Sequence, residues 1–393
     1  MHVALTCNFS PWSPYSGGGQ RSTHALASAL CRLGVEVSVI YTKSLLEEIE
    51  PTTPPPYRLI WAPFIGLRSR RQAPLRPANA APVAWALREL HAASPISVVH
   101  GQGEECALAP TALPDTPLVV TPRYPDYPDR LKSHRRGLAR ASVWLTDPKY
   151  LVLGEALRQA DLICPTSHAA RRLVEQAFGL PTDRMVVVPN GIEASFLDAA
   201  PVDPQAHTDG AIVYFGRFSA EKGPDTLVEA WGRLPVDTRP RLVLCGRGEL
   251  LAPLRERADA LGGAEQVTLR GWCEPPIMVR ELRRARAAVI PSREESFGNT
   301  AAEAMAVGAP VVLSRAGSLP EVVGDDSLAL WFEPGDAGGL ARALAALLAD
   351  PVAAAERAAR ARAAIARRFR WDSVAERFLE CYAEARRRHV RAP

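Results

Sequence analysis

Strand patterns and helix patterns alternate at a regular pitch through the second half of this 393-residue chain. Strands are predicted, in order, for AIVYFGRF, RLVLCGRG, QVTLRG, AAVIPS and APVVLS. Helices are predicted between them, for DTLVEAWGRL, ELLAPLRERADAL, PIMVRELRRA and the segment after a Phe-Gly-Asn-Thr turn. Such alternation predicts a parallel, doubly wound sheet, because parallel strands need a crossover connection. One alanine-rich helix, LARALAALLADPVAAAERAARARAAIARRF, and a last helix from Trp371 complete this half.

The first half begins in the same way. HVALTCNF is predicted as a buried strand, THALASALCRLG as a helix ended by Gly34, and VEVSVIYT as the next strand. Further strands are predicted for PISVVHGQG and TPLVVT, and helices for DRLKSHRRGLARASVWL, VLGEALRQA and a segment ending near Gly179. Residues 51–80 are rich in proline and arginine and are predicted as an irregular excursion.

The chain is longer than one hydrophobic core usually supports, so two domains are expected. Periodicity is lost in IEASFLDAAPVDPQAHTDGA, which places the boundary at about 195–209. The expected domains are therefore 1–200 and 201–370, followed by a helix at 371–393. The fold class is α/β, with two Rossmann-like domains whose parallel sheets face each other across a cleft. Hinges are expected at 195–209 and before Trp371.

Composition excludes some classes of protein. The net charge is only +4, so no nucleic-acid partner is expected. Seven cysteines lie far apart without metal-binding spacing, which fits a reducing cytosol. The N-terminus has no basic region followed by a long apolar run, and no apolar run reaches about 18 residues. A cytoplasmic protein is therefore expected.

Residues 57–149 hold a local excess of positive charge, with 13 Lys and Arg against 7 Asp and Glu. A solvated basic face explains this excess. A surface that steers an anionic acceptor, or that touches an acidic membrane peripherally, explains it as well.

Two carboxylates stand eight residues apart in PSREESFGNTAAEAMAVGAPVV. On one helix, Glu295 and Glu303 would lie about 12 Å apart and about 80° out of register, so they would not share a face. If Glu295 closes the loop after the strand and Glu303 lies early in the next helix, both face the cleft at the strand's carboxyl end. Backbone N–H groups at Gly298, Asn299 and Thr300 then suit a phosphate. A capping box, in which Glu303 merely bonds the backbone N–H of Thr300, is the structural alternative.

Two cations follow a strand at the same expected sheet edge. Gly216 and Arg217 lie at the end of the strand predicted for AIVYFGRF, and Lys222 follows five residues later. A guanidinium fork and an ammonium point charge together suit a diphosphate. A pair of surface charges in a polar turn is the alternative.

Three glycines, Gly17, Gly18 and Gly19, lie in the first strand-to-helix loop. Glycines there let the backbone approach a phosphate closely. A merely mobile loop would contain them too.

An ordered set of runs carries a family resemblance. VVVPNGIE, YFGRFSAEKGPDTLVEAW, LVLCGRGEL, VTLRGW, AAVIPSREESFGNTAAEAMAVGAPVV and SLPEVVGD resemble, in order and spacing, the retaining glycosyltransferases of family 4, which have the GT-B fold. The resemblance covers essentially all of 160–380 and extends more weakly to the glycine loop. It implies an N-terminal domain on the acceptor side, a C-terminal domain that binds a nucleotide sugar, and a last helix packing back on the N-terminal domain.

The resemblance also implies roles for particular residues. Glu295, the first glutamate of the family's E-x7-E motif, would hold hydroxyls of the donor sugar, and Glu303 would bind the ribose. Arg217 and Lys222 would neutralise the diphosphate of the leaving nucleotide. The remaining implied contacts are Phe297, Gly298, Asn299 and Thr300 to sugar and phosphate, Arg270 and Gly271 around the base, and Gly17, Gly18 and Gly19 to the phosphates from the other domain. No metal is expected, because arginine, lysine and a helix dipole would supply the positive charge.

One departure from the family concerns the acceptor side. Many members have a histidine in a T-x-H pattern at a strand end, whereas this chain has Thr121, Pro122 and Arg123. Either His100, which ends the preceding strand, or Arg123 is expected to take its place.

The resulting hypothesis is a metal-independent hexosyltransferase without a cofactor. It would move a sugar from a UDP-, GDP- or ADP-sugar to a hydroxyl of a saccharide, a lipid-linked saccharide or a small molecule, with retention of configuration. Other activities on the same fold are a sugar-nucleotide 2-epimerase and a phosphorylase that uses pyridoxal phosphate. A non-catalytic subunit that binds nucleotide sugars is the alternative outside catalysis.

Overall fold

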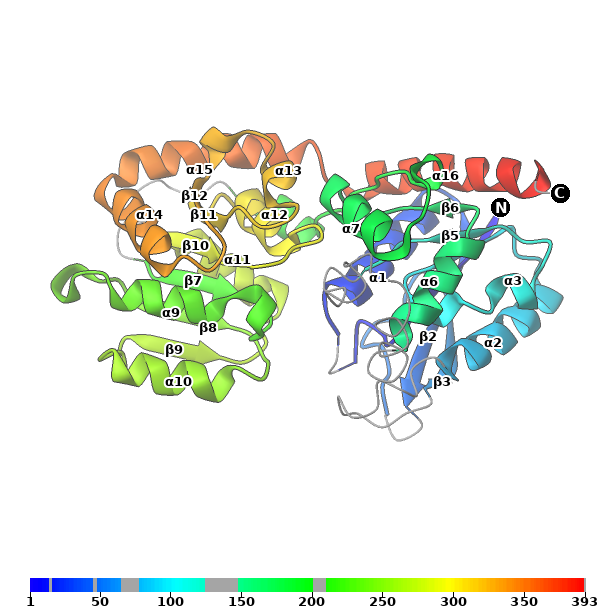
Figure 1. The fold of residues 1–393 in the computed structure, drawn as a ribbon, viewed down its shortest axis with the longest axis horizontal. Coiled ribbons are helices and arrows are strands. Elements are labelled where there is room, and N and C mark those ends of the chain that lie inside the picture. The colour runs from blue at the N-terminus through cyan, green and yellow to red at the C-terminus, as the bar shows by residue number, and fades with distance from the viewer. Residues whose placement is uncertain (14–15, 45–47, 65–77, 124–147, 201–209, 392–393) are drawn as a thin grey trace. The chain divides into compact units, whose positions relative to one another are not determined.

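A computed structural model describes residues 1–13, 16–44, 48–64, 78–123, 148–200 and 210–391. The chain divides into two compact units. Unit 1 comprises Met1–Gly191 and Trp371–Pro393, and unit 2 comprises Ile192–Arg370. The change of unit after Gly191 comes a few residues before the expected boundary, and the last helix belongs to unit 1 (Figure 1).

Unit 1 is built on a six-stranded parallel sheet with the order β3-β2-β1-β4-β5-β6. Its strands are β1 (His2–Cys7), β2 (Glu36–Ser44), β3 (Arg58–Phe64), β4 (Val98–Gly101), β5 (Leu118–Val120) and β6 (Leu162–Ile163). The strand order reverses between β1 and β4. Open α/β sheets bind ligands at such a switch point, outside the carboxyl ends of the strands.

The longer described helices of unit 1 are α1 (Gly18–Arg32), α2 (Ala80–Ala93), α6 (Lys149–Gln159), α7 (His168–Phe178) and α16 (Trp371–Arg391); a short helix, α3, spans Ala109–Ala112. Helix α16 returns to this unit although 179 residues of unit 2 precede it. It shares a buried core with α1, to which Leu26, Leu30 and Tyr382 contribute. Burial of that apolar face is what holds the terminal helix in place.

The prediction for residues 51–80 was wrong in part, because β3 lies within this stretch and pairs in parallel with β2. β3 is an edge strand with a mostly half-buried pattern, and an edge strand, which has a neighbour on one side only, is where a sheet tolerates a proline such as Pro63. Residues 65–77 of that stretch, and the predicted basic helix at 129–145, lie outside the described residues.

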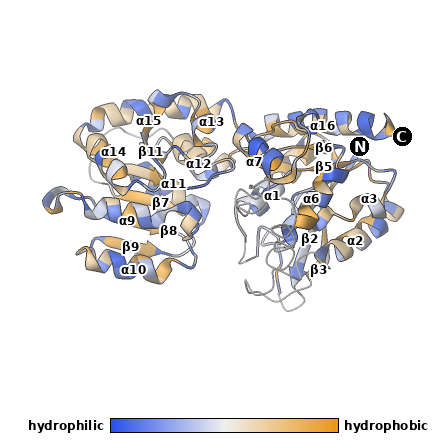
Figure 2. Ribbon diagram, in the orientation of Figure 1, coloured by the Kyte–Doolittle hydropathy of each residue, from blue (hydrophilic) through white to orange (hydrophobic). Residues whose placement is uncertain are grey.

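Unit 2 repeats the same topology with a second six-stranded parallel sheet, as expected for a doubly wound fold. The order is β12-β11-β10-β7-β8-β9, which reverses between β7 and β10. Its strands are β7 (Ile212–Phe215), β8 (Leu242–Cys245), β9 (Val267–Arg270), β10 (Ala287–Ile290), β11 (Val311–Ser314) and β12 (Leu330–Phe332). Figure 2 shows strands such as β7 and β11 in orange, in keeping with strands buried on both faces.

The described helices of unit 2 are α8 (Ala194–Leu197), α9 (Pro224–Gly232), α10 (Leu251–Ala260), α11 (Pro275–Arg284), α12 (Asn299–Val307), α13 (Leu319–Val323), α14 (Ala337–Ala349) and α15 (Pro351–Ala366). The predicted single alanine-rich helix is wrong, because α14 and α15 meet at a bend of 102°. Pro351 lacks the N–H that a continuous helix needs, and the Asp350 side chain accepts from the Ala353 N–H to begin α15. Among the described residues no single helix could span a membrane, and only this bent pair combines the needed length and apolar composition.

Candidate active site

The switch point of unit 2 brings together a lysine and a glutamate from two separate loops. Lys222 follows β7 and Glu295 follows β10, and β7 and β10 are paired neighbours in the sheet. Lys222 Nζ lies 2.7 Å from Glu295 Oε2, and the two side chains are only 20% and 8% exposed. The fold therefore assembles an oppositely charged pair where a parallel sheet binds its ligands.

Glu295 is held on several sides. Ser292 Oγ donates to its carboxylate at 3.3 Å. Its backbone carbonyl accepts from Ser318 N at 3.2 Å and from Ser318 Oγ at 3.3 Å. A carboxylate fixed in this way is preorganised, because little rotamer entropy remains to be lost when it binds a ligand.

Arg293 fastens the β10 loop onto the β7 loop, and the sequence analysis did not identify it. Its two Nη atoms donate to Asp225 Oδ1 and Oδ2 at 2.9 and 2.7 Å, and further bonds reach the Ala220 carbonyl and Thr226 Oγ1. Burial would raise the pKa of Asp225, but the hydrogen bond and charge of Arg293 outweigh it and the pKa lies below its usual value. The signal in the sequence was an arginine two residues before Glu295 in SREES.

The same two loops approach so closely that one position must be glycine. Gly223 has φ of 62°, and a Cβ there would lie 2.1 Å from the Pro291 carbonyl oxygen. Any side chain would push the two loops apart.

Helix α12 begins beside Glu295 with an uncapped N-terminus. Gly298, with φ of 97°, is the N-cap residue, and no side chain caps the helix. Thr300 is the second helical residue, so the capping-box interpretation of Thr300 and Glu303 is wrong. Glu303, 6% exposed, is the fifth residue of the helix, whereas Glu295 lies in the preceding loop.

The other residues expected around this helix differ in exposure. Phe297 is 4% exposed and packs edge-on against Phe369 with ring centroids 5.4 Å apart, which directs its ring into the core. Asn299 and Thr300 are half-buried at the start of the helix, where the first backbone N–H groups have no intrahelical acceptor.

Arg217 lies on the same edge but is paired within its own loop. Gly216 and Arg217 follow β7, and Arg217 Nη2 lies 2.9 Å from Glu221 Oε1. The arginine is 62% exposed, so this ion pair contributes little free energy. Burial would raise the pKa of Glu221, but hydrogen bonds and the two neighbouring cations lower it below its usual value.

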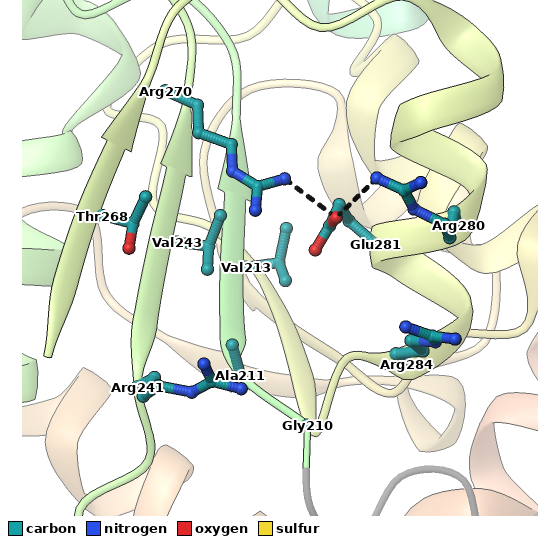
Figure 3. Close-up of a pocket in the computed structure, with 10 residues that line it drawn as sticks. All are labelled: Gly210, Ala211, Val213, Arg241, Val243, Thr268, Arg270, Arg280, Glu281 and Arg284. Carbon is teal, nitrogen blue, oxygen red and sulfur yellow. Dashed lines mark hydrogen bonds and ion pairs between the residues drawn. The ribbon is translucent and has the colours of Figure 1, made fainter.

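Arg270 ends β9 and Gly271 follows it, and the Arg270 side chain turns toward α11. Arg270 Nη1 lies 2.9 Å from Glu281 Oε1, and Arg280 also contacts that carboxylate at 3.5 Å (Figure 3). These residues line a pocket of about 620 Å³ between the sheet and α11. Gly271 is exposed and is not part of the lining.

Unit 1 has its own polar cluster at its switch point, and the sequence analysis missed the two acids in it. Asn8, after β1, donates from Nδ2 to Glu104 Oε1 at 3.1 Å, and Thr6 Oγ1 donates to Glu105 Oε1 at 3.1 Å. Both glutamates are at most 1% exposed. Burial and the charge of Glu104 raise the pKa of Glu105 to about 7. A Glu-Glu pair three residues after a strand end was the available signal.

The acceptor-side candidates lie in unit 1 but in different environments. His100 is fully buried; its Nδ1 lies 2.8 Å from Tyr382 Oη and its Nε2 lies 2.8 Å from Thr121 Oγ1. Burial, and then the charge of Arg123, lower the pKa of His100 to about 3, so the imidazole is neutral near pH 7. Arg123 instead is half-buried. It lies beside Gly19, which is in the first turn of α1.

Sequence profiles of two families match the two halves of the chain. The profile described as Glycosyltransferase Family 4 matches residues 16–196, and the profile described as Glycosyl transferases group 1 matches residues 200–367. The chain belongs to the glycosyltransferases of the family 4 type. The chain has the GT-B fold: each of its two units has a six-stranded parallel sheet of the same doubly wound topology, and solved glycosyltransferase structures share this fold.

Individual relatives agree with this assignment. A D-inositol 3-phosphate glycosyltransferase from Xylanimonas cellulosilytica is 38% identical over 62% of this chain and 62% of its own length. Another from Segniliparus rotundus is 28% identical over 100% of this chain and 90% of its own length.

Solved structures share the fold of this family 4 type chain. Sucrose-phosphate synthase from Thermosynechococcus elongatus has a TM-score of 0.79 at 23% identity, with 98% of each chain covered. The Anabaena protein HepE in complex with UDP and glucose has a TM-score of 0.74 at 20% identity, covering 98% of this chain and 99% of its own.

Proposed function

We propose that this protein transfers a hexose from a nucleotide diphosphate sugar to an acceptor hydroxyl, with retention of configuration and without a metal ion. The observation that carries the proposal is the contact between Lys222 and Glu295 across β7 and β10. It places a fixed carboxylate that can accept from sugar hydroxyls beside a cation that can neutralise a phosphate.

The cations and the start of α12 stabilise the negative charge of the leaving group. As the bond between the anomeric carbon and the diphosphate oxygen breaks, negative charge develops on the diphosphate. Lys222, Arg217 and the uncapped N–H groups of α12 stabilise that charge, and this supports a reaction without a metal. Arg217 must leave Glu221 to contribute, and an exposed pair costs little to break.

Retention follows from attack on the face that the leaving group vacates. The acceptor oxygen bonds to the anomeric carbon, its proton passes to the departing diphosphate oxygen, and the products are a glycoside and a nucleoside diphosphate. Glu295 holds donor hydroxyls in this scheme, because its salt bridge to Lys222 makes it a poor nucleophile.

The proposed substrates follow the named relatives. The Anabaena structures contain UDP and UDP-glucose, which makes a UDP-sugar the first donor to test. Relatives are named for D-inositol 3-phosphate and for glycogen, which supports a saccharide or a small polyhydroxylated molecule as acceptor.

A binding and turnover experiment tests this function. Wild type, Lys222→Ala and Glu295→Ala are incubated with UDP-, GDP- and ADP-sugars, with and without acceptor saccharides, and products are separated by chromatography. Glycoside formation by wild type and its loss in both variants is the expected result. Isomerised nucleotide sugar in the absence of acceptor would indicate an epimerase, and tight donor binding without turnover with any acceptor would indicate a binding subunit. Either result, or wild-type transfer by both variants, contradicts the proposal.

A further inference from the structure

Arg123 is a half-buried cation whose partners in the described part of unit 1 are all neutral. It follows β5 and donates from Nε to Gln102 Oε1 at 2.7 Å and from Nη1 to Asn190 Oδ1 at 2.5 Å. Among the described residues no carboxylate forms an ion pair with it. Burial lowers the pKa of Arg123 to about 10, so the group is still charged near pH 7.

A partly desolvated cation without a counter-charge favours an incoming anion. Taking a charge out of water costs free energy unless an opposite charge accompanies it. Within the described residues, amide oxygens accept from two of the five N–H donors of the guanidinium, and these amides carry no negative charge. The remaining N–H groups, including both on Nη2, keep the planar geometry that binds carboxylate or phosphate with two parallel hydrogen bonds.

Among the described groups near Arg123 are further hydrogen-bond donors without an acceptor, although the Gly17 N–H at the start of α1 donates to Gln20 Oε1 at 3.0 Å. Gln102 is 3% exposed, and its Nε2 has no hydrogen-bond partner within the described chain, although its Oε1 is held by Arg123. Gly19, in the first turn of the 15-residue helix α1, lies against the arginine: a Cβ built there would be 3.7 Å from Arg123 Cδ. The N-cap residue of this helix, Gly17, has no side chain to occupy the first N–H groups. A guanidinium, an amide and a helix N-terminus therefore offer hydrogen-bond donors to one small region.

We propose that Arg123, with Gln102 and beside the first turn of α1, binds a phosphate or carboxylate group of a substrate and so selects an anionic substrate over its neutral counterpart. This rests on the proposed transferase function. The group is distinct from the donor diphosphate, which every nucleotide sugar carries and which cannot discriminate among them. It belongs either to the acceptor or to the transferred sugar.

Arg123 stands at the position of the histidine in the T-x-H pattern. The family 4 pattern has a histidine here, which is mostly neutral near pH 7. A permanently charged guanidinium in its place favours ligands that a neutral imidazole does not distinguish.

Matched pairs of ligands test the proposal and identify the source of the anion. The acceptor arm compares glucose 6-phosphate with glucose and myo-inositol 1-phosphate with myo-inositol, in the presence of UDP. The donor arm compares UDP-glucuronic acid with UDP-glucose. Dissociation constants are measured by titration calorimetry for wild type, Arg123→Gln and Arg123→Lys. Arg58→Gln removes an exposed arginine of the same unit and is the control.

Wild type is expected to bind the anionic member at least tenfold more tightly in one of the two arms. Arg123→Gln should lose this preference while keeping its affinity for the neutral member, Arg123→Lys should recover part of it, and Arg58→Gln should match wild type. An equal affinity for both members in both arms of wild type, or a preference that survives in Arg123→Gln, overturns the proposal.

A second variant, Gly19→Ala, keeps the proposal testable if Arg123→Gln does not fold. Gly19→Ala puts a methyl at ordinary contact distance from Arg123, which the fold accommodates, and it crowds the proposed binding region. Any effect of this methyl on the donor diphosphate is shared by both members of a ligand pair, so the readout is the ratio of their dissociation constants. The preference for the anionic member should fall, and an unchanged preference would count against the proposal. Failure of the transferase function would appear separately, as turnover that is insensitive to Lys222 and Glu295.

Discussion

Lys222 Nζ and Glu295 Oε2 lie 2.7 Å apart, and this pair joins the loops after β7 and β10 at the point where the strand order of unit 2 reverses. The pair unites the two motifs that were recognised separately in the sequence, 73 residues apart. Because both side chains are largely buried, neither can be removed without affecting the other.

The first prediction concerns the coupling of this pair. Lys222→Met leaves the Glu295 carboxylate buried without its cation, which should lower the free energy of unfolding by about 2 kcal/mol. Turnover should fall about 100-fold in Lys222→Met and in Glu295→Gln, as for loss of one preorganised charge-stabilising group. The activation free energy of the double variant should rise by less than the sum of the rises in the two single variants, because the two residues act as a unit. Steady-state kinetics and urea unfolding measure both quantities.

Lys43→Met is the control for the lysine. Lys43 is 23% exposed, close to the 20% of Lys222, but its acidic neighbour Glu50 is 79% exposed at 3.9 Å. No carboxylate is stranded there, so turnover should be unchanged. Strict additivity in the double variant would show that the contact has no role in catalysis.

A second prediction concerns Arg293, which positions the loop without being assigned a substrate contact. Arg293→Lys keeps the charge but loses the two parallel bonds to Asp225 and the bonds to Ala220 and Thr226. We expect a fall in turnover of about tenfold, with the melting temperature lowered by only a few degrees. Arg315→Lys, which disrupts a pair of similar exposure between Arg315 and Asp326, is the matched control. Equal kinetics for both variants would exclude a positioning role.

The pH dependence of the Arg293 contact has a definite sign. The pKa of Asp225 is lower in the folded protein than its ordinary value of 3.8, so the contact contributes stability that is present above pH 3.8 and is lost as the pH falls through the folded value. Asp225→Asn should remove this dependence. Unfolding of wild type and Asp225→Asn is followed as the pH is lowered below 4. Identical acid-unfolding curves for the two proteins would contradict a stabilising contact between Arg293 and Asp225.

A third prediction compares two glycines with the same backbone strain, of which only Gly223 has a carbonyl oxygen where a side chain would lie. Gly223 and Gly179 both have φ of 62°, but a Cβ on Gly223 would lie 2.1 Å from a carbonyl oxygen, whereas one on Gly179 meets nothing within 4 Å. Gly179→Ala should cost only about 1 kcal/mol of left-handed strain. Gly223→Ala should cost several-fold more and should abolish turnover, because the two loops must separate. Similar unfolding midpoints for the two variants would show that the loops yield easily.

A fourth prediction concerns His100 and Glu105, whose titrations oppose each other. The pKa of His100 falls from 6.5 to about 3 on folding, so stability from the neutral imidazole is complete above pH 6.5 and is lost as the pH falls toward 3. The pKa of Glu105 rises from 4.5 to about 7, so stability from the protonated carboxyl is complete below pH 4.5 and is lost as the pH rises toward 7.

Between pH 4.5 and 6.5 these two effects act in opposite directions. Glu105→Gln should expose the histidine effect, so that its unfolding free energy declines toward acid relative to wild type by up to about 1.4 kcal/mol per pH unit. Urea unfolding at pH 7.5, 6.0 and 5.0 provides the comparison. A constant difference between the two proteins across this range would mean that the pKa of Glu105 is not raised.

Several features of the fold and site were predictable because they depend on local pattern. Strand-helix alternation gave the doubly wound sheet of unit 2, and the Phe-Gly-Asn-Thr turn gave the start of α12 between Glu295 and Glu303. Both follow from hydrophobic periodicity and turn chemistry over about ten residues. β3 was missed because an edge strand is only half-buried and carries a proline, so it lacks the apolar signature of the central strands.

Other features depend on contacts between distant residues. Arg293 and Glu104 are charged residues near strand ends, and that position is the one local sign that separates them from solvated side chains. Their partners, Asp225 and Asn8, lie 68 and 96 residues away and meet them only because parallel strands bring their carboxyl ends to one edge.

The sequence by itself thus determined the α/β class and the family, and it singled out Glu295 and Glu303 as candidates, because these depend on periodicity and on motifs of fixed spacing. Only the tertiary structure decided that Lys222 pairs with Glu295, that His100 is sealed between Thr121 and Tyr382, and that Arg123 has no acidic partner among the described residues. The physical reason is that the charge state and reach of a side chain depend on its burial and its neighbours, and the strand order that supplies those neighbours is set by packing of the whole sheet.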